Sequence, residues 1–454
     1  MCHNIPALVT LTASAAVFAA LNRDDLARAE PWLARMRAGL LPGRRLDAAT
    51  IDLQHGLVAL AHGESARAAV DLRVAVDQAM REGADLLAAQ FRLPLALALH
   101  MSGAPPMAPE AELQAVSAYA DAARTPMLEH GVRMIGAWLA LRRGDVGTAL
   151  ERLRIGLSLG SEQGWYVVFP WVPRSLLQDL ALLALRHGLG GDHVHELIRR
   201  RAVPPPAPDA DEWPWRLRVY TLGRFELRIG DRPFVPVHKA PKKPLELLRA
   251  LVALGGGSNG VAGGALEQDL WPDLDGDASH NALNSALHRL RRLLGDDRAV
   301  VLSEGRLHLD PERVWIDADS FERATARAAE NDDPETIEAL LVRYPGHFLP
   351  GDESPWALVA RERIRSRFLR VASALADRLQ AKGRLEEAID LARRVTEVDP
   401  VAEGLHRVQI HWLHVLGREA EALDAFRRCQ ALLRTVLGTR PEVATMELAR
   451  QIGA

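Results

Sequence analysis

Hydrophobic and polar positions along the chain follow two spacings, and these divide it into three stretches. Up to about residue 198 the sequence is rich in Ala and Leu, and apolar positions recur with helical spacing. Between Leu217 and Ile229 apolar and polar residues alternate, which predicts short strands. Helical spacing returns near Asp317. The pattern therefore predicts a mostly α-helical protein with a small α+β region at its centre.

Both helical stretches carry one short signature, in which a turn-forming residue is followed five positions later by Ala. It occurs at Asn22/Ala27, Gly63/Ala68, Gly144/Ala149, Gly383/Ala388 and Gly417/Ala422. Gly ends a helix because it tolerates the left-handed conformation, and Ala lets the next helix approach closely. The last two copies are 34 residues apart, the tetratricopeptide period. We predict stacked tetratricopeptide-like hairpins in both stretches, with a generic helical bundle as the alternative for residues 1–198.

A proline-rich segment, RRRAVPPPAPDADEWPW, separates the first stretch from the strands. Three consecutive prolines remove backbone donors and fix φ, so a helix cannot cross them. The predicted domains are a helical-repeat domain at 1–198, a linker at 199–215, a DNA-binding domain at 216–310 and a second helical-repeat domain at 317–454.

The central region predicts a winged helix-turn-helix. After the strands come three helices, in KKPLELLRALVALGG, ALEQDLWP and SHNALNSALHRLRRLLG, and then AVVL and RLHLD form a hairpin. Ser279 is expected to cap the third helix, at about 279–294, and Gly295 to end it.

The third helix carries the predicted chemistry. Its leucines repeat at i, i+4, i+7 and i+11, one apolar stripe for the core. The opposite face contains no acid, and its side chains suit a major groove. We predict base contacts from Asn281, Ser285 and His288, and phosphate contacts from Arg289, Arg291, Arg292, Lys239, Lys242 and Lys243. Alone, such a face is more often a solvated charged surface; the surrounding strands, helices and hairpin favour DNA.

Net charge, cysteine content and the one long apolar run indicate where the protein acts and how it could bind nucleic acid. The net charge of −3 gives the whole chain no basic character, so the case for nucleic acid is local. Two cysteines are too few for a disulfide framework and fit a reducing cytoplasm. The apolar run from Val9 to Leu21 is too short to span a bilayer and has no basic start. It predicts a buried helix in a cytoplasmic protein that does not contact membranes.

No motif predicts an enzyme, a metal or a cofactor. The Gly-rich GGGSNGVAGG is not followed by Lys-Ser/Thr, so it predicts an elongated turn and no nucleotide site. HVHE at residues 193–196 predicts surface residues, and His411 and His414 have no third ligand. Cys429 is interpreted as a packing residue.

Several segments resemble a known family. RVYTLGRFELRIGDRPF, KKPLELLRALVALGG, LHRLRRLLG and GRLHLD resemble the OmpR-type winged helix of SARP-like regulators. DADSFERA, PGHFLPGDESPWALVARERIRSRFLR and LGREAEALDAFRRC resemble their bacterial transcriptional activator domain. The region before the prolines is similar to the tetratricopeptide region of MalT-like regulators. In the wing, Arg306 stands where the family often has Tyr, which supplies a cation for the minor groove or a phosphate.

The resemblance implies a transcriptional activator that binds promoter DNA, often at direct repeats, and contacts RNA polymerase, with a homodimer as one possibility. The helical arms would bind an effector or a partner. The alternative is a tetratricopeptide scaffold whose winged helix serves protein interaction; the near-neutral charge favours it, and the acid-free helix face opposes it.

Overall fold

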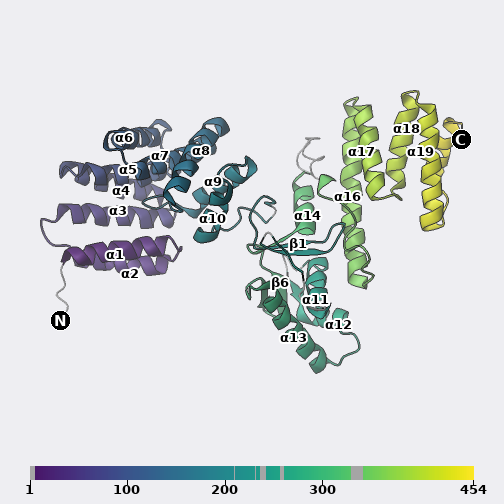
Figure 1. Ribbon diagram of the computed structural model, residues 1–454, viewed down its shortest axis with the longest axis horizontal. Helices are drawn as coiled ribbons and strands as arrows, with labels where there is room; N and C mark the ends of the chain where they lie inside the picture. Colours follow the sequence, from purple (N-terminus) through teal and green to yellow (C-terminus); the bar gives the residue numbers. More distant parts are fainter. Residues whose placement is uncertain are drawn as a thin grey trace. The chain divides into compact units, whose positions relative to one another are not determined.

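A computed structural model describes residues 6–208, 210–230, 232–235, 242–255, 260–328 and 341–453. The chain divides into two compact units, residues 1–206 and 207–454, and each is described by itself (Figure 1). The fold is mostly α, with tetratricopeptide-like helical repeats on both sides of a small α+β winged helix-turn-helix, as the sequence predicts.

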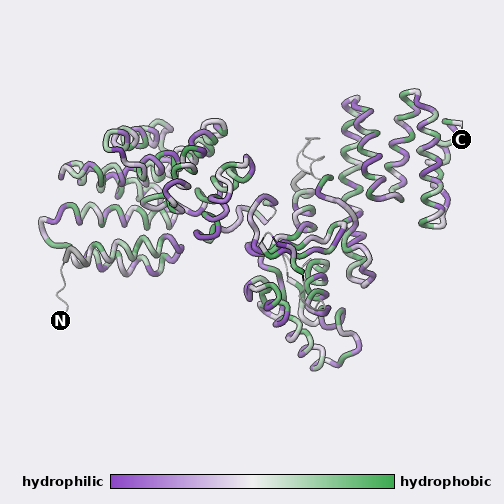
Figure 2. The backbone as a smooth tube through the Cα atoms, viewed as in Figure 1, coloured by the Kyte–Doolittle hydropathy of each residue, from purple (hydrophilic) through white to green (hydrophobic). Residues whose placement is uncertain are grey.

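The first unit is an array of antiparallel helices. These are α1 (Pro6–Leu21), α2 (Leu26–Ala38), α3 (Arg45–Ala61), α4 (Ser65–Arg81), α5 (Asp85–Met101), α6 (Met107–Ala123), α7 (Pro126–Arg142), α8 (Val146–Gln163), α9 (Arg174–Arg186) and α10 (Gly191–Arg201). Hydropathy alternates along them as it does along amphipathic helices (Figure 2). Each helix therefore buries one side against its neighbours.

The turns between paired helices show the repeat clearly. Asp24, Gly63, Gly103 and Gly144 all have positive φ, and they follow one another at intervals of about 40 residues. The interval exceeds the 34 residues of the C-terminal copies because the helices here are longer. Ala68 and Ala149 are fully buried at the predicted helix crossings.

The first copy of the signature was assigned two residues too early. Ala27 is exposed, whereas Ala29 is fully buried, five positions after Asp24. Asp24 takes the left-handed turn conformation that we had expected of Asn22. Asp and Asn both tolerate this conformation, so residue type alone does not distinguish the two positions.

The first and last helices of this unit are tied together. The α8–α9 connection carries Phe169 to within 6.4 Å of Phe18 on α1, measured between ring centroids. Arg174 at the start of α9 pairs with Asp24 at 2.7 Å. Arg201 at the end of α10 donates a hydrogen bond to the side chain of Asn22. We call this set of contacts the closure of the array.

The first helix is only partly buried. Ala13 and Val17 are fully buried, but Leu11 is 67% exposed, so the prediction of a buried helix holds for one face alone. Within the described residues, no helix is both long and apolar enough to cross a membrane.

The second unit opens with two small sheets. The strands are β1 (Leu217–Tyr220), β2 (Glu226–Ile229), β3 (Arg232–Pro233), β4 (Val261–Ala262), β5 (Val300–Ser303), β6 (Arg306–Leu309) and β7 (Val314–Ile316). One sheet has the order β3-β2-β1-β7, with β1 and β7 parallel, and the other has the order β4-β6-β5. The alternating residues of β1 bury Leu217 and Val219 and leave Arg218 and Tyr220 on the outer face.

Helices complete the unit. α11 (Lys242–Ala253), α12 (Gly263–Leu270) and α13 (Gly276–Leu294) pack between the sheets. Then follow α14 (Asp317–Ala328), α16 (Pro355–Ala381), α17 (Leu385–Val398), α18 (Glu403–Val415), α19 (Glu419–Leu432), the π-helix η1 (Leu433–Leu437) and α20 (Val443–Gln451). Ala388 and Ala422 are fully buried where the repeat predicts tight crossings.

The winged helix and the C-terminal repeats share one hydrophobic core, which runs without a break from Leu217 to Leu405. Their join is also polar. The Asp317 carboxylate accepts hydrogen bonds from the Thr221 backbone N–H, the Thr221 hydroxyl and the Leu222 N–H, all within 2.9 Å. Arg361 on α16 donates to the carbonyl oxygens of Phe348, Leu349 and Asp352. The two parts therefore belong to one compact unit.

The expected linker at 199–215 is largely structured. α10 continues to Arg201, and Gln178 donates to the Pro204 carbonyl inside the first unit. Trp213 and Trp215 are buried in the second unit, where Arg218 donates to the Trp213 carbonyl. The prolines stop the helix, as the sequence predicts, but the tryptophans bury too much apolar area to stay in solvent. The division into three domains and a linker remains a prediction.

Candidate nucleic-acid interface

The third helix of the winged helix, α13, begins three residues earlier than predicted. Asp275, not Ser279, is the N-cap: its carboxylate accepts from the Ala278 N–H at 2.9 Å. Ser279 is buried inside the first turn, and its hydroxyl donates to the Gly276 carbonyl. Gly295 ends the helix with φ +65°. Asp is as good a cap as Ser, and the acidic turn before the helix offered several candidates.

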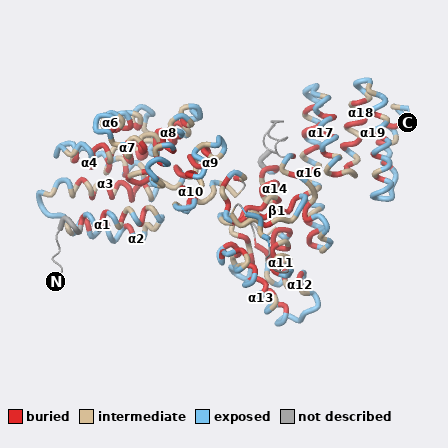
Figure 3. Tube along the Cα trace, viewed as in Figure 1, coloured by how far each residue is buried: buried red, intermediate tan, exposed pale blue. Residues whose placement is uncertain are grey.

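The apolar stripe of α13 faces the core, as the leucine spacing predicts. All four of its leucines are buried, at Leu283, Leu287, Leu290 and Leu294. Figure 3 shows α13 with a buried side and an exposed side. Burial of the stripe fixes the rotation of the helix about its axis, so the opposite face must meet solvent.

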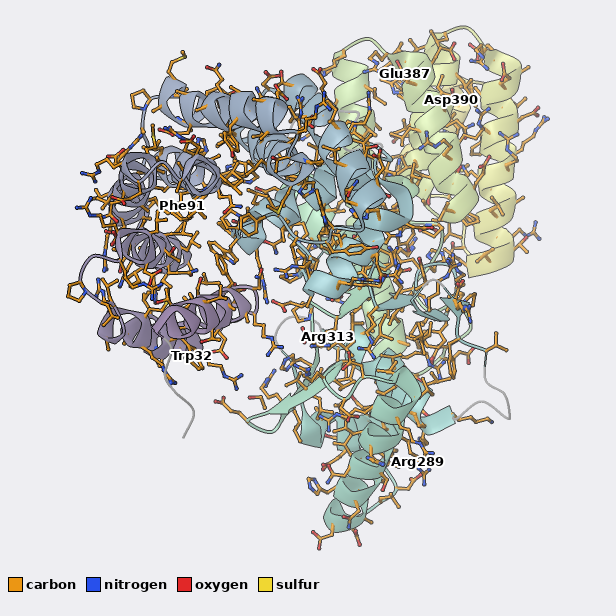
Figure 4. The ribbon with its side chains drawn as sticks, turned by 60° about the vertical axis from the view of Figure 1, so that its left-hand side comes forward. Trp32, Phe91, Arg289, Arg313, Glu387 and Asp390 are labelled. Carbon is orange, nitrogen blue, oxygen red and sulfur yellow. The ribbon has the colours of Figure 1, made fainter. Side chains whose placement is uncertain are left out.

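Five predicted residues lie together on that exposed face: Asn281, Ser285, His288, Arg289 and Arg292. Arg289 is labelled on the helix in Figure 4. The sequence from His280 to Arg292 contains no acidic residue, so this part of the face presents donors and positive charge. Because α13 begins at Gly276, Asp277 also lies on the helix, exposed and one turn before Asn281, so the face is not free of acid as the sequence predicted.

Sequence reasoning missed one member of the face. Asn284 is exposed and lies one turn from both Asn281 and His288. Its amide has the same donor and acceptor pair as Asn281. The helical spacing of three residues from Asn281 was sufficient to predict that Asn284 lies on this face.

The structure places Arg291 differently from its neighbours. Its guanidinium donates two hydrogen bonds to the Val300 carbonyl, at 3.0 and 2.8 Å, and so ties α13 to the start of β5. The side chain is half-buried. This geometry explains its conformation without DNA.

The wing is a two-residue hairpin between β5 and β6. Glu304 and Gly305 both have positive φ, which is the turn that matches the twist of the strands. Arg306 lies beside the turn, and its guanidinium donates to the Gly260 carbonyl at 2.6 Å. The side chain therefore holds the wing against the segment before β4, at the edge of the predicted interface.

The lysines near α11 fall into three cases. Lys242 is exposed at the first position of the helix. Lys243 donates to the Leu270 carbonyl at 2.9 Å, pairs with Glu246 and lies over the Trp271 ring, so it links α11 to the end of α12. Lys239 lies outside the described residues.

The Gly-rich segment is more ordered than the expected turn at the positions that the structure describes. Val261–Ala262 forms β4 and pairs with β6, and Gly263 begins α12. Gly260 needs its glycine: its φ is +66°, and an added Cβ would stand 3.3 Å from the Leu307 carbonyl oxygen.

The histidines and Cys429 set aside from metal chemistry differ in their surroundings. His193 is buried, not at the surface, and stacks on Tyr166 at 4.9 Å between ring centroids. Burial raises the pKa of the Cys429 thiol to about 12, which fits packing. Among the described residues, no three His, Cys, Asp or Glu side chains are arranged to hold a metal.

Comparison with known proteins bears on the second unit. Residues 316–453 match the family described as the bacterial transcriptional activator domain. The resemblance to SARP-like regulators that carry this domain is thereby confirmed, and that family is a regulator type, not an enzyme class.

Two curated relatives match a longer part of the chain. Regulatory protein AfsR of Streptomyces coelicolor is 26% identical over 273 residues, which cover 58% of this chain and 26% of the relative. The AfsR of Streptomyces griseus is 26% identical over 213 residues, 45% of this chain and 22% of the relative. The chain thus spans about a quarter of the length of these curated relatives.

Among solved structures, Mycobacterium tuberculosis EmbR in complex with a low-affinity phosphopeptide is 24% identical, with a TM-score of 0.40, and the match covers 52% of this chain and 65% of that one. The P58(IPK) TPR domain is 10% identical, with a TM-score of 0.21, and covers 98% of this chain and 97% of that one. Both scores are below 0.5, so neither likeness adds to the fold described above.

Proposed function

We propose that this chain is a DNA-binding transcriptional regulator without catalytic activity, and that it activates transcription. α13 enters the major groove of promoter DNA. The observation that carries the proposal is the exposed face of α13 from Asn281 to Arg292, which contains no acidic residue and is fixed in orientation by the burial of Leu283, Leu287 and Leu290 on the other side. A helix presented in this way, with a hairpin beside it, is the geometry of a recognition helix.

The roles on the face follow from position along the helix. The N-terminal part of a recognition helix meets base edges, so Asn281, Ser285 and His288 contact bases. Arg289 and Arg292 lie nearer the C-terminal end and hold phosphates. Lys242 reaches a phosphate from the flank, and Arg306, whose guanidinium donates to the Gly260 carbonyl, holds the wing beside the groove.

The helical arrays supply the regulatory contacts of this proposal. Tetratricopeptide-like arrays offer extended surfaces for proteins or ligands, and RNA polymerase is the partner that an activator must reach. Two copies of the chain bind direct repeats in the promoter. The protein acts in the cytoplasm.

Two substitutions on α13 test the proposal. Asn281→Ala is expected to cost about 1–3 kcal/mol at the cognate site and to relax the preference at one base pair. Arg292→Ala is expected to weaken binding to all sequences and to lower the salt slope by about one ion. Selection from genomic fragments followed by fluorescence anisotropy at several salt concentrations measures both effects.

Two matched variants serve as controls. Arg427→Ala removes an arginine of similar exposure from α19 and should leave the salt slope unchanged. Arg291→Ala should lower the melting temperature more than the salt slope, because its guanidinium is bound to the Val300 carbonyl. If Asn281→Ala and Arg292→Ala both bind cognate and random DNA like the parent chain, α13 does not read DNA.

The second candidate is a scaffold in which the winged helix binds protein. The net charge of −3 favours it, because most DNA-binding domains have a basic surface. It predicts no salt-dependent binding to mixed genomic DNA, and the anisotropy measurement above distinguishes the two candidates directly.

A further inference from the structure

A pocket of about 220 Å³ lies on the outer face of the four-stranded sheet, away from the exposed face of α13. The sheet contributes its outward side chains from β1 and β7, and the segment before β1, the start of α14 and residues 342–345 form the walls. The polar and aromatic lining consists of Asp211, Arg218, Tyr220, Arg224, Trp315, Asp317, Ser320 and Arg343.

The floor of the pocket is aromatic. The rings of Tyr220 and Trp315 meet edge to face, with centroids 5.3 Å apart. Arg218 lies over Trp315 at 5.4 Å and Arg224 over Tyr220 at 4.7 Å. A guanidinium stacked on a ring keeps its edge N–H donors for other partners. Arg218 donates to the Asp211 and Trp213 carbonyls, whereas Arg224 donates to Glu226 through Nε and is half exposed.

Arginines slightly outnumber carboxylates around this floor. Arg218, Arg224 and Arg343 line the pocket together with Asp211 and Asp317. The Glu226 carboxylate forms ion pairs with both Arg224, at 2.7 Å, and Arg228, at 2.5 Å. The pocket therefore retains positive charge for an added anion.

The carboxylate of Asp211 already pairs with one arginine of the pocket. Asp211 pairs with Arg343 at 2.9 Å and also accepts from the Trp315 indole N–H and the Ser320 hydroxyl. Arg343 remains 37% exposed at its side chain, so a second anion can approach it from solvent. Because Arg343 already forms an ion pair with the Asp211 carboxylate, a ligand carboxylate is the kind of group that it binds.

We propose that the pocket binds a small aromatic carboxylate, with its ring on Tyr220 and Trp315 and its carboxylate on Arg343 and Arg224. The volume is below the usual range for drug-sized ligands, which restricts the body of the ligand to one ring. The ligand competes with Asp211 for Arg343, so its binding loosens the segment that precedes β1. The site goes beyond DNA reading and does not depend on it.

Calorimetric titration of the full chain with benzoate tests the proposal. Benzoate is expected to bind one to one, and benzyl alcohol, which has the ring without the charge, about tenfold more weakly. Arg343→Gln should weaken benzoate binding about tenfold, and Arg427→Gln should leave it unchanged. Arg224→Gln is the second variant if Arg343→Gln does not fold, as judged by circular dichroism.

Three outcomes would overturn the proposal: no heat of binding with benzoate, equal affinity of the parent chain and the arginine variants, or inorganic phosphate binding as tightly as benzoate. The last outcome would show an anion site without ring recognition. None of these results depends on DNA binding, so a failure of the proposed function and a failure of this site are distinguishable.

Discussion

The two helical arrays use the same turn but differ in how their ends are held. Gly63 and Gly144 in the first array and Gly383 and Gly417 in the second all have φ between +72° and +81°. Each is followed five residues later by a fully buried Ala. The local signature thus sets the hairpin in both arrays, whereas helix length and the treatment of the ends come from residues outside it.

The ends of the two helical arrays are held by different kinds of contact. The first array is closed on itself, in part by the Arg174–Asp24 pair, whose side chains are 34% and 48% exposed. The second array is fused to the winged helix through a continuous core and the buried carboxylate of Asp317. Exposed ion pairs contribute little to stability, whereas a buried carboxylate with several donors contributes much.

The largest expected effect comes from Asp317→Ala. It leaves the Thr221 and Leu222 N–H groups buried without acceptors, at a cost of at least about 3 kcal/mol. Calorimetry of the full chain should show the transition of the second unit moving to lower temperature, while that of the first unit stays in place. Asp24→Ala is the corresponding removal in the first array; it removes an exposed ion pair and puts Ala at φ +54°, and together these should cost about 1–2 kcal/mol, less than Asp317→Ala.

If Asp317→Ala and Asp24→Ala shift the two transitions by the same amount, the contrast between buried and exposed ends is wrong.

An intermediate effect is expected when the shared signature is disturbed. Ala68→Leu in the first array and Ala422→Leu in the second each force a larger side chain into a fully buried crossing. Each should cost about 1–3 kcal/mol, in its own unit only. Urea unfolding followed by circular dichroism measures the loss. Ala27→Leu is the control, because Ala27 is exposed and the change should be nearly neutral.

An unchanged midpoint for Ala422→Leu, with Ala68→Leu destabilised, would mean that the two arrays do not share the same crossing.

The smallest effect is expected from pH. Burial and the neighbouring His193 lower the pKa of His130 to about 4, below the ordinary value of 6.5. Below pH 6.5 the unfolded chain takes up a proton that folded His130 does not, so stability falls as the pH falls. Between pH 7.5 and 5.5 the loss from this group is about 1 kcal/mol. Thermal unfolding at both pH values measures it, and His130→Gln should remove this part of the pH dependence.

A first-unit transition with the same pH dependence in His130→Gln as in the parent chain would contradict this assignment.

Periodicity predicted most of the helices and strands, but not β4, which lies in the segment expected as a turn, and not the contacts between distant elements. The leucine stripe fixed which side of α13 is buried, and the spacing of Gly and Ala located most repeat turns. Neither pattern could indicate that β7 pairs in parallel with β1, because Val314–Ile316 is uniformly buried and shows no alternation. A short apolar run of this kind does not reveal its partner.

At the candidate site too, the sequence predicted which side chains are exposed but not which contacts they make. Exposure of Asn281, Ser285, His288, Arg289 and Arg292 follows from helical geometry alone. The binding of Arg291 to the Val300 carbonyl, and of Arg306 to the Gly260 carbonyl, does not. Those hydrogen bonds depend on the path of the wing. The sequence alone does not distinguish an arginine that binds a phosphate from one that binds a backbone carbonyl.

The closure of the first array changes how that unit folds. In an open array each repeat touches only its neighbours, so the ends fray and folding can start anywhere and spread. Here Asn22 and Arg201 meet across 179 positions, and forming that contact requires a large loss of chain entropy. The high separation slows folding. In return, a terminal repeat must lose its contacts with the other end of the array, as well as those with its neighbour, before it can unfold.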